Sequence, residues 1–374
     1  MMLRTDCRHF PGDRPCAPHK ERGAVCDSCT EYAPAGFRIA IIKLDAVGDV
    51  LRTTCILQGL KEAHPQSRIT WVTSAPAVPL FQGNELVDRV LEAEDPATMA
   101  RLSVEAFDLL INLDAAPRSA ALAQFCTAAR KQGYGMDASG GVVCFNPEAE
   151  RWLQMGAFDT LKRANTRTYQ DLMLEICGLR GARRDIILRL SAAEREEAAA
   201  FGRSHGLGKG ARVVGMNTGA GPRWEMKKWT LEGYASLIRM VLEKTDWSVI
   251  LYGGEGERER NGELSRERGP RVVTAETGGS LRSFFALLDL CHILITGDTL
   301  ALHAGTALGK RVIALFGPTS EAEIETYGRV RKVVSETMKC RCYYRPVCDQ
   351  DPNCMNTIGA ERVFGILQEE ARCL

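Results

Sequence analysis

Three stretches in the second half of the chain combine glycines with small polar or acidic residues. They read GMNTGAGPRW, LYGGEGE and ITGDTLALH, and each ends a short apolar run of the kind that forms strands. Glycines let the backbone approach a ligand closely, and the N–H groups at the start of a following helix favour an anion. One such stretch means little, because glycine turns end many strands. Three together predict a nucleotide-diphosphate site, whose first two loops supply Thr218, Gly219, Gly253, Gly254 and Glu255.

A lysine pair follows the first of these loops. Lys227 and Lys228 precede an apolar anchor, Trp229, and then a helix, so a lysine can reach into the anion site. Two solvated lysines are the plain alternative. In the third stretch, Asp298 and Thr299 lie where the N-cap of a helix belongs, and capping is the default explanation for both.

His303 falls one turn into that same helix, on the face that can turn toward the strand ends. A single histidine in a helix is usually structural. This one follows a capped loop and precedes Gly317-Pro318-Thr319 at the end of the next strand. That setting favours a place for His303 in the same site.

The first half of the chain has one carboxylate in a comparable position. In IIKLDAVGDVLRTT (41–54) an apolar strand runs into a glycine turn, and Asp49 comes directly after Gly48. Asp49 either caps the following helix or does chemistry. The repeated glycines of a dinucleotide-binding turn are missing and no acidic residue clearly takes the ribose role, which argues against a dehydrogenase.

The elements that must position these residues alternate along the chain. Buried strands are predicted in FRIAIIKL, RITWVTS and FDLLINLD, and a helix over 49–63. After a charged, alanine-rich connector around 180–212, a second set has strands in ARVVGMNTG, WSVILYGG, CHILITGD and KRVIALFG, and helices over 230–244, 280–290 and 300–308. Strands separated by helices form parallel sheets covered on both faces.

We therefore predict an α/β fold of two doubly wound, Rossmann-like domains in succession, with a cleft between them. Ligands of such sheets bind beyond the carboxyl ends of the strands. The expected boundaries are a cysteine-rich arm over 1–36, a first domain over 37–190, a second over 191–356, and a helix over 357–374 that packs back on the first domain.

Two clusters hold eight of the 14 cysteines. In a reducing cytoplasm such clusters more often hold a metal than form disulfides. The arm has no core of its own, so a metal would provide its folding energy. We expect structural zinc ahead of iron or an iron–sulfur cluster, against the alternative of loose reduced thiols, and the clusters could form one site or two. The candidate ligands are Cys7, Cys16, Cys26 and Cys29, and Cys340, Cys342, Cys348 and Cys354.

Charge and hydropathy exclude several classes of protein. The chain has 48 Lys and Arg residues and 47 Asp and Glu residues, a net charge of +1. It therefore lacks the excess of basic residues that is typical of nucleic-acid-binding proteins. The N-terminus lacks the apolar core of a secretory signal, and no window approaches about 18 uninterrupted apolar residues. We expect a cytoplasmic protein.

The motifs resemble those of glycosyltransferase family 9, the ADP-heptose heptosyltransferases of lipopolysaccharide synthesis. The resemblance is carried by KLDAVGDVLRTT, KKW, GDTLALHAGTALGKRVIALFGPTS and CRCYYRPVCDQDPNCMNTI, and covers most of the chain from Phe37. It implies the GT-B architecture of two facing Rossmann-like domains. The chain departs from the family at Leu300, where many members have the glycine of Asp-Thr-Gly, which puts N–H access and the identity of the sugar in question.

The resemblance also implies roles for single residues. The aspartate of the family's Gly-Asp-Val motif, here Asp49, would be the catalytic base. Lys227 would hold the donor's phosphates, and Asp298 and Thr299 would bind the donor's sugar and phosphates, with His303 nearby. No catalytic metal is implied, because a lysine and the helix ends would stabilise the diphosphate charge that a divalent metal ion would otherwise stabilise.

The function that follows is inverting transfer of a heptose or related sugar from an ADP-sugar to a cell-surface glycan, such as the lipopolysaccharide core. The acceptor could be a glycan or lipid-linked and lie at the inner membrane surface, and the protein could form oligomers. Two alternatives are a sugar-nucleotide-binding regulatory or assembly protein without transfer activity, and a heptosyltransferase that acts on a protein. The presence of both Asp49 and Lys227 argues against a mere binder, which needs only the second-domain site.

Overall fold

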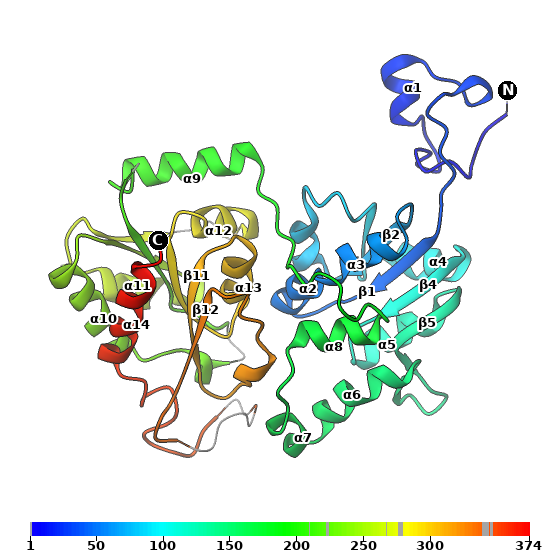
Figure 1. The fold of residues 1–374 in the computed structure, drawn as a ribbon. Helices are drawn as coiled ribbons and strands as arrows, with labels where there is room; N and C mark the ends of the chain where they lie inside the picture. Colours follow the sequence, from blue (N-terminus) through cyan, green and yellow to red (C-terminus); the bar gives the residue numbers. More distant parts are fainter. Residues whose placement is uncertain are drawn as a thin grey trace.

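The structure is a computed structural model that describes residues 2–208, 210–221, 224–266, 268–275, 280–338, 344 and 347–374. The described residues form two α/β bodies side by side, each built on one six-stranded sheet (Figure 1). A small N-terminal arm extends away from the first body and holds α1 (Ala17–Arg22) and the 3-10 turn η1 (Cys26–Ser28).

The first sheet has the strand order β3-β2-β1-β4-β5-β6, and β6 alone runs antiparallel to its neighbour among the described strands. Its strands are β1 (Arg38–Ile42), β2 (Arg68–Thr73), β3 (Arg89–Glu92), β4 (Phe107–Asn112), β5 (Ala128–Met136) and β6 (Val142–Cys144). Its helices and turns are α2 (Val47–Thr53), α3 (Ile56–Ala63), η2 (Ala75–Phe81), α4 (Pro96–Val104), α5 (Pro117–Phe125), η3 (Pro147–Ala149), α6 (Glu150–Ala157), α7 (Asp159–Arg163) and α8 (Tyr169–Ile176).

The second sheet is parallel and has the order β12-β11-β10-β7-β8-β9. Its strands are β7 (Val213–Asn217), β8 (Ser248–Tyr252), β9 (Val272–Ala275), β10 (Ile293–Gly297), β11 (Arg311–Phe316) and β12 (Val330–Val334). Its helices and turns are α9 (Ala192–Ser204), η4 (Glu225–Lys227), α10 (Leu231–Lys244), η5 (Glu255–Glu257), α11 (Arg258–Ser265), α12 (Leu281–Leu288), α13 (Leu300–Ala307), η6 (Glu321–Glu323) and α14 (Ala360–Ala371). Within the described ranges, no helix combines the length and the apolar character needed to cross a membrane.

Both sheets are covered by helices on both faces, as predicted. Successive strand residues point to opposite faces, and in β1 Ile39 and Ile41 join one apolar cluster while Ala40 and Ile42 join another. All four are fully buried. The prediction of two doubly wound domains in GT-B arrangement is confirmed, and it explains why the strands read as continuous apolar runs.

The single helix expected over 49–63 is instead two helices, α2 and α3. Two threonine hydroxyls turn back to the backbone at the break: Thr53 Oγ1 donates to the Asp49 carbonyl (2.6 Å) and Thr54 Oγ1 to the Leu51 carbonyl (2.7 Å). Thr54 Oγ1 also accepts from the backbone N–H of Ile187 (2.8 Å). Such side-chain bonds compete with the helical ladder, which periodicity cannot reveal.

The C-terminal helix does not pack back on the first domain, and that prediction was wrong. Phe364 and Leu367 of α14 are buried in the core cluster of the second sheet, together with Trp229 and Tyr234. Figure 1 shows α14 beside α10 in the second body. The apolar face of α14 fits either body by periodicity, and the Arg311–Glu370 ion pair (2.5 Å) holds it against β11.

Candidate active site

A cleft of about 1580 Å³ lies between the two domains. The segments that line it follow the carboxyl ends of strands in both sheets, as expected for doubly wound folds. The first domain contributes residues after β1 and β4 together with α2 and α6, and the second contributes residues after β7, β8, β10 and β11. The loops that sequence analysis singled out in the two halves of the chain therefore face one common space.

Asp49 lines this cleft from the first turn of α2. The N-cap of α2 is Ala46, so Asp49 is the third residue inside the helix rather than its cap. The carboxylate is 38% exposed, and its Oδ1 lies 2.8 Å from Nη2 of Arg52 one turn further along. The capping alternative therefore fails for this residue, although a carboxylate in a first helical turn still favours the helix dipole.

Several cations determine the ionisation of Asp49. Burial in the cleft raises the pKa of its carboxyl group, but the positive charges of Arg52, Lys43, His303 and Lys227 outweigh burial and lower the pKa from 3.8 to about 2. His303 counts among them because it is itself protonated in the acid range where Asp49 titrates. At neutral pH Asp49 is a carboxylate and can accept a proton or a hydrogen bond.

Arg52 is a cleft residue that sequence analysis missed. It is 9% exposed, and its guanidinium lies 3.7 Å from the ring centroid of Tyr169. The hydroxyl of Tyr169 hydrogen-bonds to Thr53 (2.6 Å), which fixes the ring. A cation held over an aromatic face and next to a carboxylate has little freedom to move. The i,i+3 spacing from Asp49 was the available signal for this contact.

Gly48 brings the two domains into direct contact beside Asp49. A Cβ at this position would lie 3.3 Å from Cα of Leu300 and 3.3 Å from Cδ2 of His303, both on α13 of the second domain. The N-terminal ends of α2 and α13 therefore meet at a residue without a side chain. Leu300, the departure from the family pattern, lies at this contact.

Lys227 and Asp298 form an ion pair in the wall of the cleft. Nζ of Lys227 donates to Oδ2 and to the backbone carbonyl of Asp298, each at 3.1 Å. The approach depends on Gly297, because a Cβ there would lie 2.7 Å from the Lys227 carbonyl oxygen. Burial raises the pKa of Asp298, but Lys227 and then His303 reverse that and lower it overall. Both residues line the cleft.

His303 is buried (6% exposed) in the second turn of α13 and lines the cleft. Burial, and then the positive charge of Arg52, lower its pKa from 6.5 to about 4, against the opposing effects of Asp298 and Asp49. The imidazole is therefore neutral near pH 7. A neutral ring can exchange hydrogen bonds with a ligand, but it adds no charge to the site.

Thr299 is the N-cap of α13, and its hydroxyl accepts from the Ala301 N–H (3.2 Å). The same oxygen lies 3.1 Å from Oγ1 of Thr296 and accepts from Nδ2 of Asn217 (3.3 Å). Thr299 lines the cleft. The capping alternative therefore holds for Thr299, and this bond network ties the third loop to the first.

The glycine loops meet around Glu257, a second residue that sequence analysis missed. Gly219, Gly253 and Gly254 line the cleft, and a Cβ at Gly219 or Gly253 would lie 2.5 Å from the Glu257 side chain. Oε2 of Glu257 accepts from the Gly254 N–H (3.0 Å), and Oε1 lies 3.3 Å from Nζ of Lys228. The absence of a side chain at Gly219 and Gly253 therefore makes room for this carboxylate.

Two of the predicted donor-binding residues are not among the described residues that line the cleft. The Thr218 hydroxyl is buried and donates to Oδ1 of Asn261 (2.6 Å). Glu255 is 77% exposed and pairs with Arg258 (2.8 Å). The structure thus brings together Asp49, Lys227, Asp298, Thr299, His303 and the three glycines, but neither Thr218 nor Glu255.

The cysteines of the arm are all half-buried, and no described cysteine forms a disulfide. Over the described ranges, the structure gathers no three His, Cys, Asp or Glu side chains into a group that could hold a metal ion. As placed, the arm cysteines therefore do not form the predicted site. Cys340 and Cys342 lie outside the described residues, while Cys348 is half-buried and Cys354 is buried. The structural metal stays a prediction.

Comparison with known families gives one extended match. The model of glycosyltransferase family 9 (heptosyltransferase) matches residues 97–351. Lipopolysaccharide heptosyltransferase 2 of Escherichia coli K12 is 27% identical over 116 residues, which is 29% of this chain and 32% of that protein. The chain therefore matches about a third of the length of that curated relative.

Solved structures match over nearly the whole chain. A family 9 glycosyl transferase from Veillonella parvula superposes with a TM-score of 0.70 at 19% identity, covering 90% of this chain and 97% of that one. The E. coli heptosyltransferase WaaC, bound to ADP-2-deoxy-2-fluoro heptose, gives 0.62 at 19% identity and covers 89% and 99%. The dodecameric, iron-containing heptosyltransferase TibC, bound to ADP-D-β-D-heptose, gives 0.57 at 12% identity and covers 90% and 77%. At these identities the likeness concerns the fold.

Proposed function

Since this chain belongs to glycosyltransferase family 9 (heptosyltransferase), we propose that it transfers a heptose or related sugar from an ADP-sugar to a glycan acceptor, with inversion at the transferred carbon. The cleft supports this proposal because it joins a carboxylate of one domain to a glycine-rich wall of the other that carries Lys227. The proposed acceptor is a cell-surface glycan such as the lipopolysaccharide core, presented at the inner membrane surface.

The donor would bind to the second domain. Its diphosphate would lie against Lys227 and the backbone N–H groups of the glycine loops, which can approach a ligand closely. The Glu257 carboxylate is placed to accept hydrogen bonds from sugar or ribose hydroxyls, since an ionised carboxylate is an acceptor only. Neutral His303 and Asp298 would contact the donor on the side facing the first domain.

Asp49 would act from the first domain as general base. As the acceptor hydroxyl oxygen forms a bond to the anomeric carbon of the donor, its proton passes to the carboxylate. The bond from that carbon to the diphosphate oxygen breaks on the opposite face, and ADP leaves with the electron pair. Lys227 and the loop N–H groups stabilise the charge that develops on the leaving diphosphate.

The ion pair between Asp49 and Arg52 suits this role in one way and opposes it in another. Arg52 holds Oδ1 of Asp49, which leaves Oδ2 for the acceptor hydroxyl. A pKa of about 2, however, makes a weak base. A bound diphosphate would place negative charge beside Lys227, one of the cations that lower this pKa. Donor binding would therefore raise the basicity of Asp49 when it is needed.

The observation that carries the proposal is the position of Asp49 in the same cleft as Lys227, Asp298 and His303. The test is sugar transfer and ADP release by wild type and Asp49→Asn, over a panel of ADP-, UDP- and GDP-sugars. The matched control is Asp95→Asn, because Asp95 caps α4 by accepting from the Ala97 N–H (2.9 Å) and asparagine caps equally well.

We expect ADP-heptose to be the preferred donor and Asp49→Asn to lose at least a hundredfold in kcat, while Asp95→Asn keeps wild-type activity. Transfer by Asp49→Asn at the wild-type rate would refute the role of Asp49. ADP-sugar binding without transfer to any glycan would instead favour a binding protein or a protein acceptor.

A further inference from the structure

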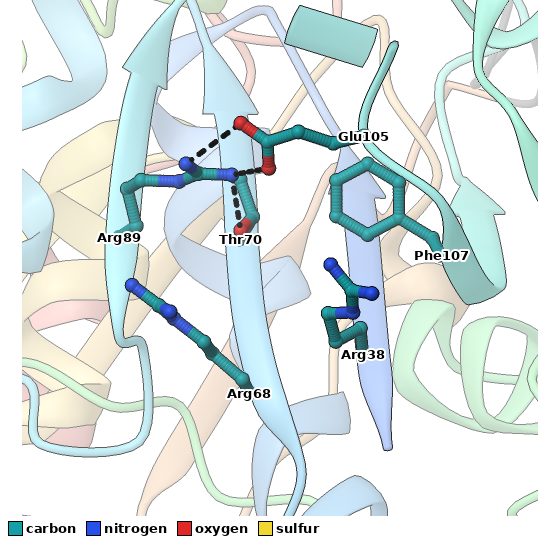
Figure 2. Close-up of a pocket in the computed structure, with 6 residues that line it drawn as sticks. All are labelled: Arg38, Arg68, Thr70, Arg89, Glu105 and Phe107. Atoms are coloured by element: carbon teal, nitrogen blue, oxygen red, sulfur yellow. Dashed lines mark hydrogen bonds and ion pairs between the residues drawn. The ribbon is translucent and has the colours of Figure 1, made fainter. Parts of the chain in front are cut away.

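We propose that the amino-terminal edge of the first sheet carries a second anion site, in which Arg38, Arg68 and Arg89 bind a phosphate group. Figure 2 shows the hollow and the side chains that line it. Arg38, Arg68 and Arg89 are the first residues of β1, β2 and β3, so they lie at the edge of the sheet opposite the cleft. The site is independent of the proposed transfer reaction.

The strand register places the arginines on one face. Arg38 of β1 is directly beside Arg68 of β2, and Thr70 of β2 is directly beside Arg89 of β3. Arg68 and Thr70 are two residues apart and therefore point to the same side of the sheet. In Figure 2 the Arg68 and Arg38 side chains lie below the Arg89 guanidinium, with the Phe107 ring above Arg38.

Arg89 is held in a fixed orientation. Its Nη1 and Nη2 donate to Oε1 (3.0 Å) and Oε2 (2.5 Å) of Glu105, and Nη2 also lies 3.2 Å from Oγ1 of Thr70. Its Nε is buried and finds no hydrogen-bond partner in the described part of the chain. The Glu105 carboxylate thus orients Arg89, and it also pairs with Arg101, which lies outside the hollow (Nη1 to Oε1, 3.5 Å).

Arg38 and Arg68 have no such partner. Among the described residues, neither guanidinium forms an ion pair with a carboxylate, and the two carboxylates nearby, Asp108 and Asp88, bond to backbone N–H groups. Asp108 accepts from the backbone N–H of Arg38 (2.7 Å), and Asp88 from the N–H of Ile69 (2.9 Å). Like charges on neighbouring strands repel each other, so this pair lowers stability unless an anion joins it.

The dimensions of the hollow suit one small anionic group. Its volume is about 40 Å³, against the ~10–15 Å³ that one water molecule needs. Guanidinium groups match the oxygens of a phosphate through paired N–H donors. A whole nucleotide does not fit, so the ligand is a phosphate group whose remainder lies in solvent. Free phosphate compounds and phospholipid headgroups share this chemistry.

The test measures binding of inorganic phosphate by calorimetry, and binding to vesicles of phosphatidylglycerol against phosphatidylcholine by flotation. The variants are Arg38→Gln/Arg68→Gln, and Arg38→Lys/Arg68→Lys, which keeps the charge but loses the paired donors. The control is Arg180→Gln/Arg203→Gln, which removes two exposed arginines from other parts of the surface. Thermal unfolding of each variant checks that it is folded.

We expect the glutamine variant to bind at least tenfold more weakly than wild type, the lysine variant to fall between them, and the control to match wild type. Binding of inorganic phosphate identifies a free ligand, whereas binding to anionic vesicles alone identifies a headgroup. The proposal is overturned if wild type binds neither probe, or if wild type and the glutamine variant bind equally. Sugar transfer by the glutamine variant is expected at the wild-type rate. The phosphate-binding measurement does not depend on transfer, so it can be interpreted even if the transfer hypothesis fails.

Discussion

Nζ of Lys227 lies 3.1 Å from both Oδ2 and the backbone carbonyl of Asp298, so the cation expected to receive the donor's diphosphate already has an anionic partner. The ligand must compete with that partner or share the lysine with it. The Lys227 ammonium has three donors, and two of them point to Asp298. A shared arrangement therefore leaves one direction for a phosphate oxygen.

Lys227→Gln should weaken ADP binding roughly 10- to 100-fold, because a hydrogen bond to a charged group contributes about 1.5–3 kcal/mol. The matched control is Arg258→Gln, since Arg258 pairs with the exposed Glu255 (2.8 Å) and neither residue lines the cleft. Calorimetric titration with ADP checks both variants. Equal losses in the two would mean that general positive charge, rather than Lys227 itself, holds the nucleotide.

Arg52→Gln should make transfer sensitive to acid. Arg52 is the strongest of the cations that lower the pKa of Asp49, so its removal raises that pKa. The acid limb of the kcat/KM profile then moves to higher pH, while wild type stays flat from about pH 5 to 8 as far as Asp49 is concerned. Arg52→Lys should restore part of the wild-type profile. An unchanged profile in Arg52→Gln would show that the ion pair does not control the base.

His303 should make stability depend on pH in a defined window. Its pKa is about 4 in the fold and 6.5 in an unfolded chain. The unfolded state therefore binds more protons between those values, and stability is full above pH 6.5 and falls as pH drops toward 4. The loss is on the order of 3 kcal/mol. Denaturant unfolding of wild type and His303→Gln at pH 7.5 and 4.5 checks this prediction. The free energy of unfolding should fall more between these pH values in wild type than in the variant.

Gly48→Ala should reduce transfer several-fold with a small change in Tm. The new methyl group meets the α13 backbone at Leu300, so the two domains must separate by a few tenths of an ångström. Misplacement on this scale affects reaction geometry more than folding. The control is Gly365→Ala in α14, where a Cβ has open space and a gain of about 0.5–1 kcal/mol is expected. Wild-type kcat in Gly48→Ala would mean that the contact adapts freely.

Metal analysis of purified protein tests the cysteine prediction. We expect about one structural metal ion per chain in wild type and its loss, with a lower Tm, in Cys26→Ser/Cys29→Ser. The scattered Cys126 is buried in the core, so Cys126→Ala controls for removal of a thiol. A metal-free wild type would leave the arm as an ordinary loop with reduced thiols.

The strand ends were predictable and the side-chain partners were not. Apolar runs and glycine turns located the loops that carry Gly219, Gly253 and Asp298, because strand periodicity and turn chemistry are local properties. Thr218 and Glu255 stand in the same loops, yet their neighbours Gly219 and Glu257 face the cleft instead. A shift of one or two residues reverses the direction of a side chain, and no sequence pattern fixes it.

The packing of elements against one another could not be predicted from the sequence either. The periodicity of α14 shows that it has an apolar face but not which domain receives it. The Thr53 and Thr54 hydroxyls interrupt a pattern that is otherwise helical from 49 to 63. Arg52 reads as a solvated helix residue until Tyr169, far along the chain, supplies the ring beneath it.

The contact at Gly48 has a further consequence for how the enzyme would avoid wasting its donor. The helix that touches Gly48 also carries His303 and follows Asp298, so separating the domains to admit a ligand withdraws Asp49 from the sugar at the same moment. Water that enters an open cleft then meets the donor without a base beside it. Hydrolysis of the donor would thus be limited because the base reaches the sugar only when the domains are closed, and not because the site distinguishes water from the acceptor chemically.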